Sequence, residues 1–195
     1  LLVGEPGVGR KAIIQGLVEK SSFGQSLPGV NFKRVVELDL QALLAGTSNP
    51  EEVEATLDAI FREAISAGNV ILVINEFHNY IAVKTGPGQI DISGVISPYL
   101  HLPEFQVVAV TTFAGLHKNI EQNPSILNLF EKVEVQEISD RETMLVLENL
   151  TPALEQKYKL FVSYPALREI IYLCRRFLTS LPFPKKAVDL LDEVM

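Results

Sequence analysis

Residues Leu1–Lys11, read as LLVGEPGVGRK, decide the fold of this chain. An apolar run enters a glycine-rich turn, and the helix-like stretch Ala12–Val18 follows it. This order is typical of a phosphate loop, in which backbone N–H groups cradle phosphates, a lysine reaches the outer phosphates and a hydroxyl holds Mg²⁺. A glycine turn before an ordinary helix has a similar spacing, so the assignment depends on the rest of the chain. The expected nucleotide-binding residues of the loop are Gly4, Glu5, Pro6, Gly7, Val8, Gly9, Arg10 and Lys11.

The last two loop positions depart from the phosphate-loop pattern. Arg10 stands where the lysine is required, and Lys11 stands where the Ser or Thr is required. A cation is kept, but an ammonium replaces the hydroxyl that binds the metal. We therefore expect ATP or ADP as the candidate ligand, with weakened binding of Mg²⁺, and no metal site made by the protein alone.

Three further segments of strand length alternate with helical patterns, and the second of them is apolar throughout. These runs are Lys33–Leu38, Val70–Ile74 and Phe105–Val110. A helix is expected after Ser48–Glu52, which offers a cap, a proline and acids near the positive end of the helix dipole, and Gly68–Asn69 ends it. A second helix is expected over Ile90–Leu100, after the connection Thr85–Gly88. The alternation predicts an α/β fold with a doubly wound parallel sheet.

Polar pairs follow two of these strands. Asn75–Glu76 ends the second run, and Thr111–Thr112 ends the third. In a doubly wound sheet, ligands bind beyond the carboxyl ends of the strands. The loop and both polar pairs are therefore expected at one edge of the sheet.

The pattern changes from Ser139 onward. A helix opens at Asp140–Glu142, and two more are expected over Tyr164–Leu178 and Pro184–Met195, with no strand among them. We expect two domains, an α/β domain over residues 1–138 and a small all-helical lid over residues 139–195.

Composition narrows the classes of partner. The 195 residues include 17 Lys and Arg against 24 Asp and Glu, a formal charge of -7. This excess of acid disfavours a nucleic-acid or anionic-membrane surface and favours protein partners. The single cysteine, Cys174, lies in an apolar pattern and is expected to be a buried structural thiol, which fits a cytoplasmic protein. Because the chain begins without methionine and inside an expected strand, we expect it to be part of a longer protein.

Five segments in this order resemble an AAA+ ATPase module, and more narrowly the first nucleotide-binding domain of the Clp-type unfoldases (ClpA, ClpB and ClpC). The segments are Val3–Gly9, Leu38–Leu40, Asn69–His78, Ala109–Thr112 and Phe183–Glu193. The resemblance covers nearly the whole chain. It implies a phosphate-loop sheet with a helical lid, ring oligomers, and protein substrates or partners.

The resemblance also implies roles for individual residues. In the family, an aspartate organises Mg²⁺ and the following glutamate activates water; here the pair is Asn75 and Glu76, so the base is kept and a metal-side charge is missing. Thr111 or Thr112 matches the sensor of the terminal phosphate. Lys186 matches the part of the lid that approaches the nucleotide, although a solvent-exposed lysine has the same sequence signature.

Two further family features are substituted. The arginine-finger positions hold Asn128 and Leu129, so no charge is delivered to a neighbouring subunit. In the pore segment Gly46–Pro50, Asn49 takes the place of an aromatic residue. Among the other polar residues, His78, His101 and His117 lack the spacing of a zinc site.

Three functions remain open at this point. The first is a Clp-like domain that keeps the fold, hydrolyses ATP poorly and acts in assembly or regulation. The second is a working ATPase in which Arg10 replaces the lysine. The third is a protein-binding module without nucleotide. Whether the chain is an enzyme therefore stays undecided.

Overall fold

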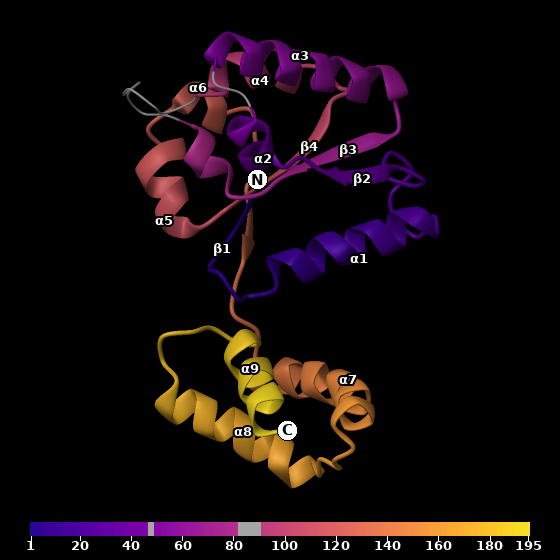
Figure 1. The fold of residues 1–195 in the computed structure, drawn as a ribbon, viewed down its shortest axis with the longest axis vertical. Helices are drawn as coiled ribbons and strands as arrows, with labels where there is room; N and C mark the ends of the chain where they lie inside the picture. Colours follow the sequence, from indigo (N-terminus) through magenta and orange to yellow (C-terminus); the bar gives the residue numbers. More distant parts are fainter. Residues whose placement is uncertain (47–48, 82–90) are drawn as a thin grey trace. The chain divides into compact units, whose positions relative to one another are not determined.

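The computed structural model describes residues 1–46, 49–81 and 91–195, which form two compact units (Figure 1). One unit holds Leu1–Val3 and Lys11–Glu134, and the other holds Gly4–Arg10 and Val135–Met195. The glycine loop, which we expected in the first domain, therefore groups with the helical residues. The boundary after residue 138 remains an assignment from the sequence pattern.

A five-stranded sheet organises the first unit. Its strand order is β2-β3-β4-β1-β5, with β1 over Leu2–Gly4, β2 over Arg34–Glu37, β3 over Val70–Ile74, β4 over Gln106–Thr111 and β5 over Val133–Val135. The pairs β2·β3, β3·β4 and β1·β4 are parallel. β3 is apolar and almost wholly buried, as expected for a strand covered on both faces. The expected doubly wound parallel sheet is confirmed.

Helices α3 (Pro50–Ala67) and α4 (Ser93–Leu100) lie close together, and α3 also contacts β3. The expected start and stop signals of α3 are confirmed: Asn49 Oδ1 accepts the Glu51 N–H at 3.2 Å, and Gly68 ends the helix with φ 70°. The ring of Phe61, which is fully buried, meets the rings of Tyr99 and Phe105 edge to face at 5.3 and 5.2 Å. These contacts anchor the apolar core on one side of the sheet.

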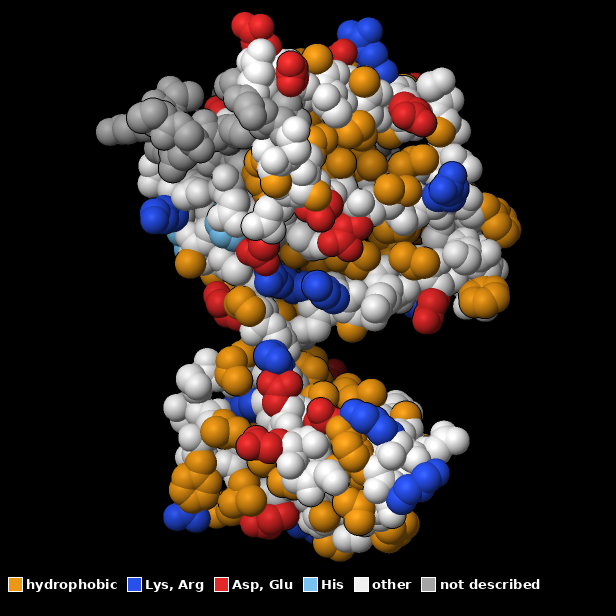
Figure 2. Space-filling view, in the orientation of Figure 1, with side chains coloured by type: hydrophobic (Ala, Val, Ile, Leu, Met, Phe, Trp, Pro, Cys, Tyr) orange, Lys and Arg blue, Asp and Glu red, His pale blue; other side chains and the backbone are white. Residues whose placement is uncertain are grey.

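Helix α1 (Arg10–Ser22) behaves differently, because it buries little of its apolar surface. Ile13 and Val18 on the helix are 48% and 38% exposed, and Phe23 and Leu27 in the following loop are 74% and 76% exposed. Figure 2 shows hydrophobic side chains open to solvent over this part of the unit. Ser21 is the buried residue of the helix. Its hydroxyl lies 2.7 Å from the Val30 carbonyl and 2.9 Å from the Lys33 carbonyl, and it accepts the Lys33 N–H at 3.1 Å.

The structure adds elements that the sequence pattern did not predict. They are α2 (Leu40–Ala45), the 3₁₀ helix η1 (Phe77–Tyr80), α5 (Phe113–Gly115), the π-helix η2 (Leu116–Ile120), α6 (Pro124–Leu127) and β5. Asp39, the residue after the strand expected over Lys33–Leu38, caps α2 by accepting the Ala42 N–H at 2.9 Å. Short elements escape periodicity because they do not complete an apolar repeat. The expected connection at residues 85–88, and the start of the helix expected from residue 90, lie outside the described residues.

The second unit contains three long helices, as expected. They are α7 (Asp140–Tyr158), α8 (Tyr164–Phe177) and α9 (Lys185–Val194). Ser139 and Glu142 form a reciprocal capping box at the start of α7. The helices bury one apolar cluster, and Cys174 within it is fully buried, which confirms the expected structural position of this thiol. Burial raises the pKa of Cys174, so the thiol stays protonated and unreactive at neutral pH.

Candidate functional site

Two glycines of the loop have backbone angles that favour glycine. Gly7 and Gly9 both have φ 104°, a conformation that side-chain-bearing residues rarely adopt. The Val8 N–H donates to the Glu5 carbonyl at 3.3 Å, which closes the turn before α1 begins at Arg10. A Cβ added to Gly7 would lie 2.9 Å from Cβ of Lys185, so the loop backbone passes closely over the first residue of α9.

The charged residues at the end of the loop differ in exposure. Arg10 is half-buried, whereas Lys11, in the position of the missing hydroxyl, is exposed on the first turn of α1. A helix N-terminus attracts anions through its unpaired N–H groups, and both cations add to that field. An ammonium, however, is not a ligand for a divalent cation. The start of α1 therefore presents two cationic side chains beside the glycine loop.

Asn75 and Glu76 follow β3 at the carboxyl edge of the sheet. The Asn75 amide donates to Oε1 of Glu37, the last residue of the neighbouring strand β2. Glu76 has left-handed backbone angles, φ 48° and ψ 41°, which are unusual for a residue with a side chain. Strain of this kind is commonly kept at functional positions, where it aims a side chain. The Glu76 side chain is 43% exposed, so water reaches it.

The His78 side chain lies between Glu76 and Thr111, the last residue of β4. Its Nδ1 lies 3.0 Å from Oγ1 of Thr111 and 3.8 Å from Oε2 of Glu76. The ring packs directly over Gly115, where an added Cβ would come within 2.3 Å of the imidazole Cγ. Asn119 also donates its amide to the His78 carbonyl at 2.5 Å. The sequence pattern excludes His78 from a zinc site but gives it no other role, and its position two residues after Glu76 is the signal that could have found it.

The two threonines after β4 have different tasks. Thr111 is fully buried and its hydroxyl faces His78, whereas the Thr112 hydroxyl accepts the Gly115 N–H at 2.9 Å and caps α5. In register, Thr111 pairs with Val3, the residue before the glycine loop. The geometry therefore separates a strand-ending cap from a polar group at the sheet edge.

A cavity of about 270 Å³ opens at the carboxyl ends of β2 and β3. Its acidic and polar lining includes Glu37, Asp39, Asn75, Glu76 and Tyr80. Burial, followed by the nearby carboxylates of Asp39 and Glu76, raises the pKa of Tyr80, so its phenol remains a hydrogen-bond donor. Within the described ranges, no three His, Cys, Asp or Glu side chains are placed to hold a metal ion. The cavity therefore offers a carboxylate base and donors for a polar ligand.

Lys186 is buried in the second unit, so the alternative of a solvent-exposed lysine is wrong. The residue is 7% exposed; its ammonium lies 3.2 Å from Oε1 of Glu137 and 4.0 Å from the centre of the Phe183 ring. The same Glu137 oxygen accepts the Phe183 N–H at 2.7 Å. That backbone bond first, and then Lys186, hold the pKa of Glu137 below its usual range. A cavity of about 370 Å³ beside Lys186 is also lined by Glu5 and Pro6 of the loop.

The structure also places the residues that the resemblance assigns to the arginine-finger and pore positions, and two of the three histidines. Asn128 is exposed at the end of α6, and Leu129 is half-buried next to it. Asn49 caps α3, while Thr47 and Ser48 of the pore segment lie outside the described residues. His101 is exposed at the end of α4, and His117 pairs with Glu121 at 2.7 Å.

No helix in the described part of the chain is long and apolar enough to cross a membrane.

Comparisons with known proteins agree with this architecture. Residues 139–195 match the family model of the AAA lid domain. The chain is 34% identical over 193 residues to the chaperone protein ClpB of Aquifex aeolicus, and 34% identical over 193 residues to the ClpC ATP-binding subunit of the ATP-dependent Clp protease of Staphylococcus aureus. Each alignment covers 99% of this chain but only 19% of the ClpB sequence and 24% of the ClpC sequence.

A solved structure of a related protein has the same fold over nearly the whole chain. A closed-state cryo-EM reconstruction of Hsp104 with ATPγS and FITC-casein matches 98% of this chain and 33% of the Hsp104 chain, with a TM-score of 0.87 and 28% sequence identity. The chain thus spans a third or less of the length of these proteins. Together with the parallel sheet and the match to the AAA lid domain, these relatives show that the chain is an AAA+ Clp-like module.

Proposed function

We propose that this module belongs to a protein-remodelling machine, holds a nucleotide at its glycine loop and hydrolyses that nucleotide poorly. Its work is then assembly or regulation of a ring whose turnover takes place elsewhere. The relatives support the first part of the proposal, because they include a chaperone and the ATP-binding subunit of a protease. Other subunits of a ring, together with protein substrates or a partner protein, are the binding partners that follow. A cytoplasmic location fits the buried free thiol of Cys174.

One observation carries the impaired-hydrolysis part. Asn75, in the position of the metal-organising carboxylate, is neutral, and its amide donates to Glu37. A hydrogen-bonded amide adds no negative charge for Mg²⁺, and the exposed ammonium of Lys11 takes the place of the second metal ligand. Within this site, Glu76 is the candidate general base, His78 positions it, and Thr111 is our choice for the phosphate sensor. Lys186, in the second unit, is the further nucleotide-binding residue that we propose.

The pairing of Asn75 with Glu37 affects how the site can be repaired. Asn75→Asp alone would replace the amide–carboxylate hydrogen bond with two adjacent carboxylates. Two carboxylates this close repel each other, and the pKa of one of them rises. The repair variant should therefore combine Asn75→Asp with Glu37→Gln, so that the donor and acceptor roles are exchanged. Arg10→Lys and Lys11→Thr complete the loop.

The test measures binding of labelled ATP and ADP with and without Mg²⁺, and then phosphate release, on the full-length protein. We expect nucleotide binding that changes little with Mg²⁺, and turnover near background in the wild type and in each single reversion. The combined variant should gain Mg²⁺-dependent turnover, because groups around a transferring phosphoryl act as a unit. Adding Glu76→Gln to that variant should abolish the gain.

Two alternatives give different results. Substantial Glu76-dependent turnover in the wild type would establish a working ATPase with Arg10 in place of lysine. No saturable binding of ATP or ADP, with an intact fold by circular dichroism, would favour a protein-binding module. The second result would remove the nucleotide from the proposal but leave the family assignment unchanged.

A further inference from the structure

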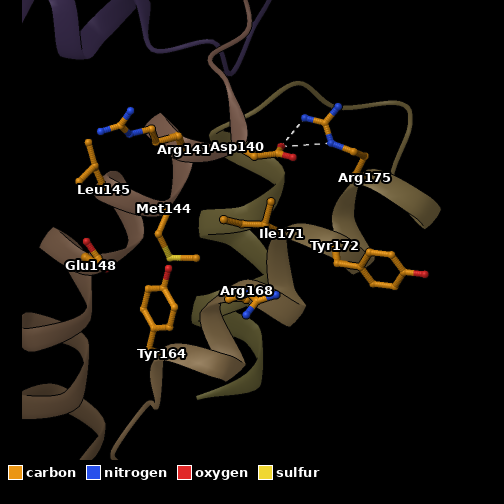
Figure 3. A pocket seen from close by; sticks show the side chains of 10 residues that line it. All are labelled: Asp140, Arg141, Met144, Leu145, Glu148, Tyr164, Arg168, Ile171, Tyr172 and Arg175. Carbon is orange, nitrogen blue, oxygen red and sulfur yellow. Dashed lines mark hydrogen bonds and ion pairs between the residues drawn. The ribbon is translucent and has the colours of Figure 1, made fainter.

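A groove of about 500 Å³ runs between α7 and α8 within the second unit (Figure 3). The lining residues from α7 are spaced three and four positions apart in the sequence, so their side chains share one helix face. That side consists of Arg141, Met144, Leu145 and Glu148. The facing stripe of α8 consists of Tyr164, Arg168, Ile171, Tyr172 and Arg175. Asp140 lies at one end of the groove.

Apolar and aromatic side chains form the floor of the groove and part of its walls. Ile171 is buried at 6% exposure and belongs to the core of the unit, so the floor is fixed. Leu145, Tyr164 and Tyr172 are instead more than half exposed, at 53%, 55% and 53%. Figure 3 shows Met144 and Tyr164 pointing toward one another across the groove. Grouped exposed apolar side chains beside polar ones are typical of an interaction site.

The charged residues beside this apolar floor differ in whether they have partners within the unit. Arg175 forms an ion pair with Asp140, and its guanidinium lies 5.5 Å from the centre of the Phe183 ring. Arg141 and Arg168 are exposed, and neither makes a side-chain hydrogen bond or ion pair with any described residue. Glu148 is the only other acid in the lining. The groove therefore has a positive excess on a chain whose formal charge is -7.

We propose that this groove binds a helical segment of a partner protein that carries apolar side chains on one face and acidic side chains beside them. The apolar face would lie over Met144 and Leu145, and the acids would meet Arg141 and Arg168. A groove between two helices accepts the side-chain ridge of a third. The α7 stripe from Arg141 to Glu148 is roughly 10 Å long, which corresponds to about two turns of a bound helix.

The acidic chemistry of the partner follows from the two arginines. Carboxylates give arginine a planar, bidentate partner, and charge complementarity sets which partner is accepted and how fast it arrives. The apolar floor requires a ligand that also buries side chains, which a polyanion without apolar groups does not supply. The site depends on lid residues alone, so it stands whether or not the module binds nucleotide.

The experiment uses the full-length protein and two fluorescein-labelled model helices of about 14 residues, with leucines at helical i, i+3, i+4 and i+7 spacing. One probe carries glutamates at its polar positions and the other carries lysines. Fluorescence anisotropy should show saturable binding of the glutamate probe, weakened by salt, and at least about tenfold weaker binding of the lysine probe.

Variants locate the binding to the groove. The double change Arg141→Glu and Arg168→Glu should weaken binding of the glutamate probe by about tenfold or more and strengthen binding of the lysine probe. Leu145→Ser should weaken binding of both probes. Matched controls are Leu150→Ser, on α7 outside the groove lining, and Lys20→Glu, an exposed residue of α1; neither should alter binding.

Three outcomes overturn the proposal. They are no saturable binding of the glutamate probe, equal binding of the two probes, or binding that the groove variants leave unchanged. Self-association that is lost in the double arginine variant, without peptide binding, would instead identify a second copy of this protein as the occupant. Circular dichroism of each variant separates loss of binding from loss of fold.

Discussion

The buried ion pair of Lys186 and Glu137 supports a quantitative prediction. Glu137→Gln removes the carboxylate charge but keeps a side-chain oxygen that can accept the Phe183 N–H, now bonded at 2.7 Å. The variant therefore isolates the charge. It leaves the Lys186 ammonium, whose side chain is 8% exposed, without its ion-pair partner.

The magnitude follows from the distance and the exposure of the two partners. Two unit charges 3.2 Å apart attract by roughly 5 kcal/mol at an effective dielectric constant of about 20. That value is an upper bound, because the Glu137 side chain is 46% exposed and water screens it. After this discount we expect a loss of about 1–2 kcal/mol, which lowers the melting temperature by about 2–8 °C for a protein of this size.

The assay is thermal and urea unfolding followed by circular dichroism. Glu193→Gln is the matched control, because Glu193 is exposed on α9 and has no ion-pair partner among the described residues. Lys186→Met, which removes the buried charge and keeps the side-chain volume, should be nearly neutral in an otherwise wild-type protein and should rescue Glu137→Gln. Equal stability of Glu137→Gln and Glu193→Gln would refute the reasoning, and so would failure of the rescue.

The remaining predictions concern the acid limb of stability and the packing of His78. Since the pKa of Glu137 is lowered in the folded protein, its stabilisation is fully present above the unfolded value of about 4.3 and is lost as pH falls through the folded value. The acid loss of stability below about pH 4.3 should therefore be shallower in Glu137→Gln than in the wild type, and identical acid limbs would contradict this. Gly115→Ala should displace the His78 ring and cost about 1–3 kcal/mol, because the new Cβ would lie 2.3 Å from Cγ. Gly94→Ala is the control, since that helical glycine faces open space; unchanged imidazole NMR shifts in Gly115→Ala would show that the ring does not pack there.

The sequence by itself determined the α/β class, the glycine loop and the three helices of the lid. Local chemistry is sufficient for these features. Val70–Ile74 is apolar throughout because both faces of its strand are covered, and Asn49 and Gly68 mark the ends of α3 through their own backbone preferences. Such signals lie within a few residues of the structure that they specify.

Only the tertiary structure decided how the candidate site is assembled. It assigned Thr111 to the polar cluster and Thr112 to a helix cap, brought His78 to Thr111, and buried Lys186 against Glu137. The Thr112 cap is a local contact with Gly115, but the contacts of His78 with Thr111 and of Lys186 with Glu137 depend on which side chain from a distant segment is close enough to bond or to exclude water. The periodicity of a single segment contains no information about that partner, so the chain must fold before the roles of these residues are fixed.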